Sequence, residues 1–290
     1  MKPFYIHVGY GKTATTWLQD RLYVSSSQCS YFGKTSDNYP GWLIRLHYLD
    51  DYAFLNEREK LKTLILQRHI EDPQKASLVS SEAFTNFTTI IPQANRIKDV
   101  FPFPRIILTI RNPISLLESY YKQNVKGGYW FLDLEQYLDR TRTPFAIQKR
   151  PPIYLPDLFY DEVIEYYGNV FGRENVCVLR YEDFVKAPND FVAQLGSFMG
   201  VDFGDVTELA KEKVLEGLAE DLVPARRLEN LRNYLSTSFP DLAKHIESYV
   251  SLADLEARPI ISQELERRLT EYFKPKCSMY FQEKRVGDIA

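Results

Sequence analysis

The sequence predicts an α/β fold, in which helices flank a central, mostly parallel sheet within a single domain over residues 1–290. Short apolar segments alternate with helical patterns between Phe4 and Gly200, and this order is typical of a parallel sheet that is covered on both faces. The apolar fraction of 44% and the charged fraction of 26% are those of an ordinary globular protein. A chain of this length can bury a sizeable core without disulfides.

Four segments are expected to form strands, because each is short, apolar and followed by a glycine or a polar turn. In chain order they are Phe4–Gly9, Ala76–Glu82, Arg105–Ile110 and Asn175–Tyr181. Helical patterns cover Thr13–Tyr23, Leu55–Glu71, Pro92–Val100, a segment from Pro113 with Asn112 as N-cap, and a segment that ends at Gly200. Ligands of such sheets bind at the carboxyl ends of the strands, so we expect the functional residues at that edge.

Three stretches do not follow this alternation. Tyr31–Tyr52 is aromatic and irregular. Residues 125–160, with "GGYWF" and "KRPPIYLP", form a loop-rich insertion that is a candidate lid over an acceptor. Within it, Tyr129–Phe131 fits either such a lid or a hydrophobic plug. From Glu208 onward the chain is helical and charged, and the sequence gives this C-terminal third no role.

Charge and cysteine usage restrict the function classes. The net charge is −3 and no polybasic run occurs, so an anionic ligand must be met by a local basic site rather than by the whole chain. No long apolar span is present, and we expect a cytoplasmic protein without an integral membrane segment. Cys29, Cys177 and Cys277 are odd in number and lack the spacing of a metal site, so we expect free thiols and no metal. Composition gives no oligomeric state.

The stretch "HVGYGKTATTW" has the outline of an ATP-binding P-loop. Gly11–Thr13 matches the end of that motif, but the earlier glycine that the motif requires falls on Ile6. The strand "RIILTI" is followed by Arg111, where Mg²⁺ would need a carboxylate, although Glu82 follows another strand. A nucleotide or small-molecule kinase that uses ATP and Mg²⁺ is therefore the alternative function.

The physical chemistry of this stretch nevertheless indicates a phosphate-like ligand. A strand, a tight turn and a helix bring free backbone N–H groups and the positive helix end to one point. Lys12 adds a full charge, and Thr13, Thr15 and Thr16 add hydroxyl donors.

The same residues carry a resemblance to a known family. "GYGKTATTWL" resembles the 5′-phosphosulfate loop of sulfotransferases, which reads Lys-(Ser/Thr)-Gly-Thr-Thr, often followed by an aromatic residue. The residues that match, after Gly11, are Lys12, Thr13, Thr15, Thr16 and Trp17. Ala14 replaces the usual glycine, and because Ala14 is expected to open the helix, it still presents its backbone amide. Trp17 either stacks on an adenine, as its family counterpart does, or packs the first helix on the sheet.

Two further motifs occur in the order that the family has. "RNPISLLESYY" resembles the 3′-phosphate motif, in which Arg111 and Ser119 would bind the phosphate. "RYEDF" resembles a Tyr-Glu-Asp segment whose tyrosine, here Tyr181, touches the adenine. "KRVGD" is weakly similar to a C-terminal Arg-Lys-Gly loop, and whether Lys284 or Arg285 reaches the 3′-phosphate stays open.

The resemblance implies a P-loop-like sulfotransferase fold and a PAPS-dependent activity (PAPS is 3′-phosphoadenosine 5′-phosphosulfate). Such enzymes move a sulfuryl group to an acceptor and leave PAP, without a metal. Lys12 would neutralise the leaving oxygen, and Glu82 would be the general base, as in relatives that act on sugars. A hydroxyl of a sugar or glycoconjugate is the expected acceptor, although the many aromatic residues suit a lipid or phenol equally. The acceptor's identity is not readable.

A histidine is the alternative to Glu82 as general base. His47 lies in the aromatic segment and would line the acceptor site, whereas His7 is expected to be a satisfied core residue. His69 and His245 are expected on helix surfaces. A non-catalytic nucleotide-binding or scaffold protein is a third alternative.

Overall fold

The computed structural model describes residues 3–85, 90–139, 154–212, 217–238 and 259–281. By its contacts the chain forms two compact units, Met1–Asn112 with Pro156–Val214, and Pro113–Leu155 with Leu215–Ala290. The single domain over residues 1–290 stays a prediction. Lys284, Arg285, His245 and residues 140–153 of the expected insertion lie outside the described residues.

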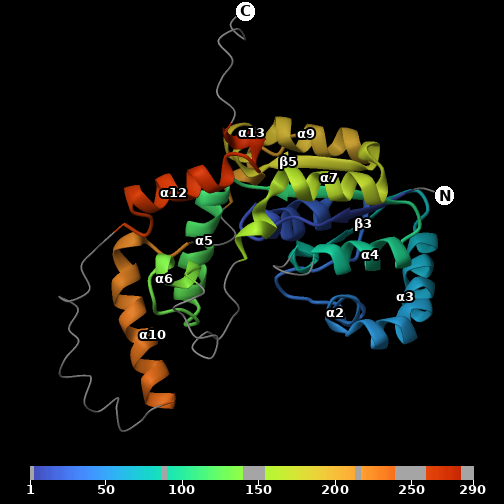
Figure 1. Ribbon diagram of the computed structural model, residues 1–290. Coiled ribbons are helices and arrows are strands. Elements are labelled where there is room, and N and C mark those ends of the chain that lie inside the picture. Colours follow the sequence, from blue (N-terminus) through green and yellow to red (C-terminus); the bar gives the residue numbers. More distant parts are fainter. Residues whose placement is uncertain (1–2, 86–89, 140–153, 213–216, 239–258, 282–290) are drawn as a thin grey trace, which may run out of the picture. The chain divides into compact units, whose positions relative to one another are not determined.

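The first unit is built around a five-stranded sheet with the order β2-β3-β1-β4-β5 (Figure 1). The strands are β1 (Phe4–His7), β2 (Cys29–Tyr31), β3 (Ala76–Ser80), β4 (Pro104–Ile110) and β5 (Val176–Arg180). All four pairings are parallel, and Ile6 of β1 lies between Val79 and Ile106. The α/β class and the four expected strands are confirmed. The edge strand β2 was not expected, because three residues are too few to show a strand period.

Helices connect these strands. They are α1 (Thr15–Trp17), α2 (Gly41–Tyr48), α3 (Asp51–Glu71), α4 (Ile90–Val100), α7 (Tyr160–Phe171), α8 (Tyr181–Lys186) and α9 (Pro188–Met199). Of these, α2, α7 and α8 were not expected from the sequence. A π-helical segment over Leu18–Tyr23 continues α1, and short 3₁₀ turns occur at Glu82–Thr85, Leu155–Leu158, Arg173–Asn175 and Leu209–Lys211. Gly200 ends α9 with φ 66°, as a helix-terminating glycine should. The expectation of an irregular Tyr31–Tyr52 is wrong, because α2 and the start of α3 lie within it.

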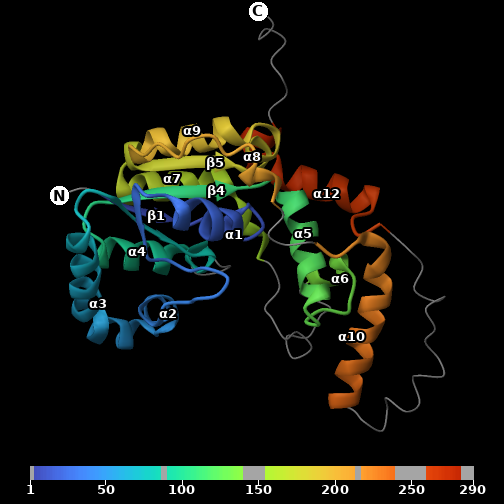
Figure 2. The same ribbon diagram turned by 180° about the vertical axis from the view of Figure 1, so that it is seen from behind.

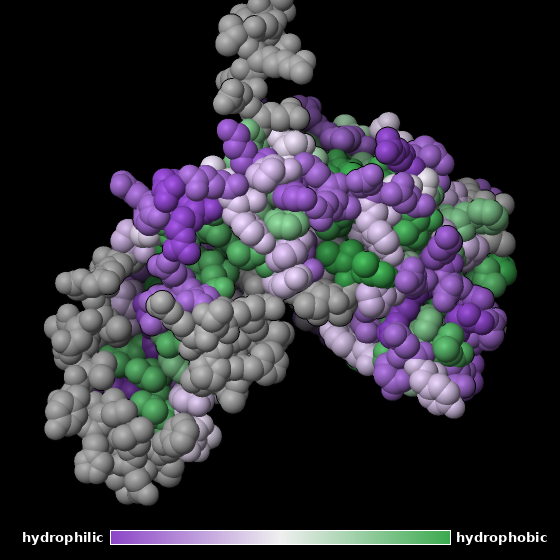
Figure 3. Space-filling view, in the orientation of Figure 1, coloured by the Kyte–Doolittle hydropathy of each residue, from purple (hydrophilic) through white to green (hydrophobic). Residues whose placement is uncertain are grey.

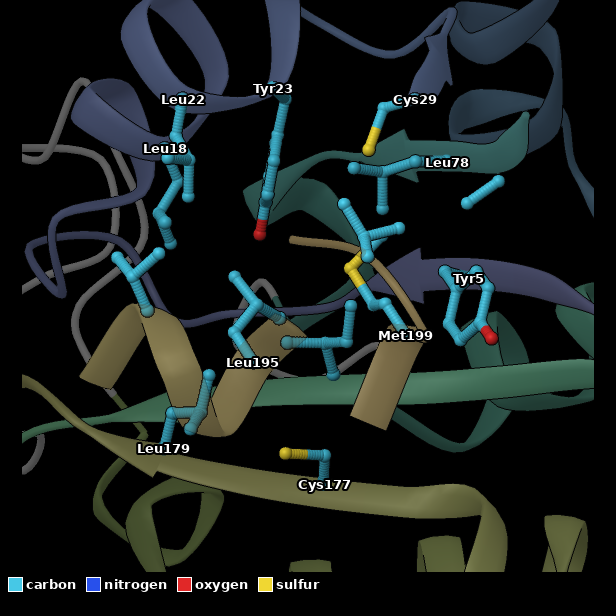
Figure 4. Packing of buried hydrophobic residues seen from close by; sticks show 14 of the residues in the cluster. Tyr5, Leu18, Leu22, Tyr23, Cys29, Leu78, Cys177, Leu179, Leu195 and Met199 are labelled. Atoms are coloured by element: carbon cyan, nitrogen blue, oxygen red, sulfur yellow. The ribbon is translucent and has the colours of Figure 1, made fainter. Parts of the chain in front are cut away.

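Both faces of the sheet are buried. On one face, α1 and α9 lie over the strands (Figure 2). There Leu18 and Leu22 pack with Leu195 and Met199 of α9 (Figure 4). On the other face, Phe4 contacts residues of the α3–α4 side, and its ring centre lies 4.5 Å from that of His69. Strands covered on both sides need apolar residues at most positions, which explains the apolar runs over residues 4–6 of β1 and 106–108 of β4.

His69 differs from the expectation of a surface residue. It is 6% exposed, and its Nδ1 hydrogen-bonds with Ser77 Oγ at 2.8 Å. The inner face of α3 turns this side chain to the start of β3, while the outer face carries ion pairs such as Lys60–Glu57. Figure 3 shows hydrophilic residues with smaller apolar areas on the visible side of the first unit.

The described part of the second unit is helical, as expected for the C-terminal third. Its helices are α5 (Pro113–Lys126), α6 (Leu134–Leu138), α10 (Val223–Ser238), α12 (Gln263–Phe273) and α13 (Ser278–Phe281), with a 3₁₀ turn at Glu220–Leu222. Trp130 is 1% exposed and stacks on Tyr137 at 4.2 Å, and its carbonyl accepts a hydrogen bond from Asn230. This burial favours the plug over the lid for Trp130.

The three cysteines are free and buried, as predicted. Among the described helices, none combines the length and the apolar character that a membrane crossing requires. The described residues also contain no group of three or more histidine, cysteine or acidic side chains that could hold a metal ion.

Candidate active site

The loop after β1 runs across the end of β4. Val8 and Tyr10 donate backbone hydrogen bonds to the carbonyls of Ile107 and Thr109, at 2.8 and 3.0 Å. A Cβ atom at Gly9 would lie 1.9 Å from Thr109 Oγ1, so only glycine fits between these two hydrogen bonds. This close approach holds the loop at the carboxyl edge of the sheet.

Two residues of the loop have left-handed backbones. Lys12 has φ 70° and Ala14 has φ 65°, a region that costs a residue with a Cβ about 1 kcal/mol or more. Ala14 is the N-cap, and its carbonyl accepts the first helical hydrogen bond from Leu18. The helix therefore begins at Thr15 rather than at Ala14, which corrects the sequence-based expectation. The left-handed cap also explains why the motif that this loop resembles has glycine here.

The three threonines of the loop have different environments. Thr13 is fully buried, and its hydroxyl donates to the carbonyl of Tyr10 and lies 2.7 Å from Thr109 Oγ1. This differs from the expectation that the Thr13 hydroxyl faces a phosphate, because the tight turn places an acceptor within its reach. Thr15 donates to Glu82 Oε1 at 2.7 Å. The Thr16 side chain is half-buried and makes no hydrogen bond to a described residue.

Glu82 follows β3 and lies beside this loop. The residue before it, Ser81, donates its N–H to the carbonyl of His7, so the ends of β3 and β1 are held together. Glu82 Oε1 accepts from Thr15, and Glu82 Oε2 accepts from Lys34 Nζ at 2.8 Å. Burial raises the pKa of Glu82, but the Lys34 charge and both hydrogen bonds outweigh burial and leave the pKa below its ordinary value. Glu82 is thus a carboxylate at neutral pH.

Lys34 is a residue that the sequence reasoning missed. It follows β2, and its N–H donates to the carbonyl of Ser80 at 3.0 Å. A Cβ at the preceding Gly33 would lie 2.4 Å from the Ser80 nitrogen, so glycine is needed for this approach. The Gly-Lys pair after the apolar "CSYF" is the sequence signal that could have located this strand end.

A buried polar network joins the ends of β1, β3 and β4 next to the site. His7 Nδ1 hydrogen-bonds with Ser80 Oγ at 2.8 Å, and His7 Nε2 with Thr109 Oγ1 at 3.0 Å. Gln19 donates to the same Ser80 hydroxyl at 2.9 Å. Burial lowers the pKa of His7 to about 4, which keeps the ring neutral, and the nearby Glu82 opposes that shift. His7 is therefore a satisfied core residue, as predicted.

Arg111 follows β4 at the same edge. Its Nη1 donates to the carbonyl of Lys12 at 3.2 Å, and its Cζ lies 4.6 Å from the ring centre of Tyr181. Its buried Nε has no hydrogen-bond partner, and no carboxylate of a described residue lies within 4.0 Å of the guanidinium. A cation placed in this way against an aromatic ring is suited to an anion that bears an aromatic base.

The segments that follow β4 and β5 are tied to each other. Asn112 N–H donates to Glu182 Oε1 at 2.9 Å, and the Tyr160 hydroxyl donates to the carbonyl of Arg111 at 2.8 Å. The structure thus brings together Gly11–Thr16, Glu82, Arg111 and Tyr181 from four separate segments of the first unit. Ser119 lies on α5 in the second unit.

Trp17 is 5% exposed and belongs to the core. Its Nε1 donates to the carbonyl of Leu209 at 3.0 Å, and its ring centre lies 4.7 Å from that of Phe184. These contacts hold the indole of α1 against α8 and the 3₁₀ turn Leu209–Lys211. This geometry favours the packing role of the two roles considered from the sequence.

His47, the rival base, is buried on α2. Its Nδ1 hydrogen-bonds with Gln93 Oε1 at 2.9 Å, and its ring packs on Phe84 at 4.4 Å. Burial lowers the pKa of His47 to about 4, against the opposing Gln93 hydrogen bond. A neutral, 6% exposed ring is a weak candidate for accepting a proton from a bound molecule.

Comparison with known proteins decides the family. The model of the sulfotransferase domain matches residues 4–284. The chain belongs to the sulfotransferase family. It is therefore a transferase of the EC 2.8.2 type, and PAPS is the donor that this family uses in general. Among curated proteins, no sequence matches.

One solved sulfotransferase structure shares the fold, and two others are similar to a lower degree. A sulfotransferase from Alicyclobacillus acidocaldarius is 21% identical, with a TM-score of 0.52 over 82% of this chain and 95% of that one. Mouse sulfotransferase SULT7A1 complexed with PAP is 13% identical, with a TM-score of 0.41 over 95% of this chain and 85% of that one. The sulfotransferase domain of the Synechococcus PCC 7002 olefin synthase is also 13% identical, with a TM-score of 0.42 over 82% and 95% of the two chains.

The residues of the first unit fit a donor with two phosphate groups. Lys12 stands in the loop after β1, and Arg111 has a buried, unpaired Nε and no carboxylate neighbour among the described residues. Glu82, a carboxylate that already has Lys34 as its cationic partner, accepts a hydrogen bond from Thr15 of the same loop. An anionic sulfuryl donor requires positive groups, and a hydroxyl acceptor requires a carboxylate nearby. Both kinds of group occur at this edge of the sheet.

Proposed function

We propose that this sulfotransferase moves a sulfuryl group from PAPS to a hydroxyl of a sugar or glycoconjugate, with Glu82 as general base and Lys12 at the leaving group. The observation that supports it best is the position of Glu82. Its ionised carboxylate lies at the carboxyl edge of the sheet and hydrogen-bonds with Thr15 of the phosphate loop. A base so close to the donor loop is within reach of a hydroxyl that attacks the donor.

On this proposal the donor is bound mainly by charge. The amides of Gly11–Thr16 and the Lys12 ammonium bind the 5′-phosphosulfate, and Arg111 binds the 3′-phosphate. Ser119 is a ligand of that phosphate by the resemblance of its motif alone. Tyr181, already against the Arg111 guanidinium, contacts the adenine. Trp17 packs in the core beside the phosphate loop, and in this proposal it does not stack on the adenine, because its indole belongs to the core cluster.

The transfer itself needs one base and one charge neutraliser. The acceptor oxygen attacks sulfur in line, its proton goes to Glu82, and the bond from sulfur to the bridging phosphate oxygen breaks. The negative charge that grows on that oxygen is neutralised by Lys12. Because its low pKa keeps Glu82 deprotonated at neutral pH, the base is ready before the acceptor arrives.

The sugar acceptor is supported by the type of base. Family members that act on sugars use a carboxylate here, and the rival His47 is buried and bonded to Gln93. Tyr48 and Tyr52, at the junction of α2 and α3, are 61% and 78% exposed. Exposed aromatic rings of this kind provide flat apolar surfaces on which sugar rings pack.

Calorimetric titration with PAP, ADP and ATP tests the donor. We expect PAP to bind without metal and far more tightly than ADP, because ADP lacks the 3′-phosphate. Preference for ATP with Mg²⁺ would favour the kinase alternative and overturn the proposal.

Replacing Glu82 by Gln tests the base once a sugar acceptor has been found by screening. We expect kcat to fall at least about a hundredfold while PAP still binds, because the amide cannot take a proton. Glu57→Gln is the matched control, since Glu57 pairs with Lys60 on the outer face of α3. Unchanged turnover in Glu82→Gln would remove Glu82 from the mechanism.

A further inference from the structure

The Thr15 hydroxyl lies between the two halves of the proposed reaction. It donates to Glu82 Oε1 at 2.7 Å, yet Thr15 belongs to the loop that would bind the donor's 5′-phosphosulfate. A hydroxyl group has a single hydrogen to donate. Thr15 can therefore serve the base or the donor, but not both at once.

We propose that Thr15 is a switch that donates to Glu82 in the free enzyme and to the 5′-phosphosulfate when the donor binds. Donor binding then frees Glu82 Oε1 for the acceptor hydroxyl. This inference rests on the proposed function, and it adds a coupling between the donor site and the base.

The surroundings of Thr15 allow such a change of partner. Thr15 is 3% exposed, so its hydroxyl is shielded from water and needs a protein or ligand acceptor. The neighbouring hydroxyls do not compete for the same role, because Thr13 is bonded to Tyr10 and Thr16 makes no hydrogen bond to a described residue. Thr15 is thus the loop hydroxyl whose partner is the candidate base.

Lys34 allows Glu82 to lose the Thr15 bond without leaving its place. Its ammonium donates to the other carboxylate oxygen, Oε2, and its backbone is fixed to Ser80 at the end of β3. When the Thr15 hydrogen turns away, this ion pair still orients the carboxylate. The released Oε1 then has a lone pair that can accept a hydrogen bond from the acceptor hydroxyl.

Charge gives the switch a direction. A phosphosulfate brings negative charge to the loop next to the Glu82 carboxylate, and like charges at this distance disfavour the ionised carboxylate. Loss of the Thr15 hydrogen bond acts in the same sense. Both changes make Glu82 a stronger proton acceptor only when the donor is present, which suits an enzyme that should deprotonate the acceptor only when the donor is bound.

A double-mutant cycle on PAP binding tests the switch without any acceptor. In Glu82→Gln, Lys34 requires the amide oxygen, so the amide nitrogen faces Thr15 and the Thr15 hydrogen is free for the phosphate. Glu82→Gln should lower the Kd for PAP by a certain factor in the wild-type background and by a smaller factor in the Thr15→Val background. We expect the first factor to be at least about fivefold larger than the second. The part of the gain that comes from removing the negative charge is common to both backgrounds and cancels.

Two further backgrounds make the outcome decisive. Thr16→Val removes a neighbouring loop hydroxyl that makes no hydrogen bond to Glu82. In this background Glu82→Gln should tighten PAP binding by the same factor as in the wild-type protein. Thr15→Ser keeps the hydroxyl and should also show that factor, which separates the loss of the hydrogen bond from a change in packing. The measurement is calorimetric titration with PAP at pH 7, with the fold of each variant checked by circular dichroism.

The outcomes distinguish this inference from the function on which it rests. Equal factors in the wild-type and Thr15→Val backgrounds, with PAP still bound tightly, would overturn the switch and leave the sulfotransferase proposal intact. Absence of PAP binding to the wild-type protein would instead overturn the proposed donor.

Discussion

Arg111 donates a hydrogen bond from Nη1 to the carbonyl oxygen of Lys12, 3.2 Å away. The residue that follows the central strand β4 is thereby tied to the loop that follows β1. Both residues were predicted as phosphate ligands from separate motifs, 99 positions apart in the chain. Their contact places the two proposed phosphate-binding positions of the first unit next to each other.

Replacing Arg111 by Ala should therefore weaken PAP binding by about 2 kcal/mol or more, which is about thirtyfold in Kd. The physical reason is the loss of charge-assisted hydrogen bonds to the 3′-phosphate. Calorimetric titration with PAP measures the effect. The control is Arg45→Ala on α2, which breaks a pair with Glu57 of α3. An unchanged affinity in Arg111→Ala would remove this residue from the 3′-phosphate site.

Replacing Lys34 by Met should change how activity depends on pH. The Lys34 charge and its hydrogen bond hold the pKa of Glu82 down against burial, so their removal must raise that pKa. Glu82 is then protonated over a wider acidic range, and the acid limb of kcat/KM moves to higher pH. Activity at pH 5 relative to pH 8 is the direct measurement, with Lys60→Met as the control.

Lys34→Met should also change how the free energy of unfolding depends on pH, and the linkage between protonation and folding fixes the sign of that change. A carboxyl group whose folded-state pKa lies below its unfolded value stabilises the fold above the unfolded pKa, and this contribution is lost as the pH falls through the folded pKa. Urea unfolding of the wild-type protein should therefore show a Glu82 contribution at pH 7 that disappears at low pH. A Lys34→Met variant whose stability difference from wild type is the same at pH 7 and pH 3 would contradict this account.

Ala14→Gly should not destabilise the protein, although alanine to glycine within a helix ordinarily costs about 1 kcal/mol. Ala14 has φ 65°, a conformation that glycine adopts without strain and alanine does not. Ala193→Gly on the exposed side of α9 is the matched control, and it should lose about 1 kcal/mol. Urea midpoints compare the two, and an equal loss in both variants would show that the left-handed cap carries no strain.

Much of the fold was readable because it is local. Each predicted strand is a short, largely apolar run, and the helix that begins at Pro113 has its own start signal in Asn112 and Pro113. The loop after β1 was found for the same reason, since its residues are contiguous. His69 was misplaced because a helix pattern of weak amphipathicity does not show which face is buried, and only the contact with Ser77 decides that.

The surroundings of the base were not readable. Lys34 follows a three-residue strand that has no period of its own, and its partner Glu82 lies 48 residues later. The Thr15–Glu82 hydrogen bond spans 67 residues. Nothing in the spacing of these residues indicates that they meet.

The sequence by itself determined which residues carry charge and hydroxyl groups, where the strands end, and that these ends share one edge of a parallel sheet. Only the tertiary structure decided the strand order β2-β3-β1-β4-β5. That order places β3 and β4 on either side of β1, so Glu82 and Arg111 flank the loop that contains Lys12 and Thr15. Strand order depends on packing between segments far apart in the chain, and for this reason the partners of Glu82 follow from the fold rather than from any motif.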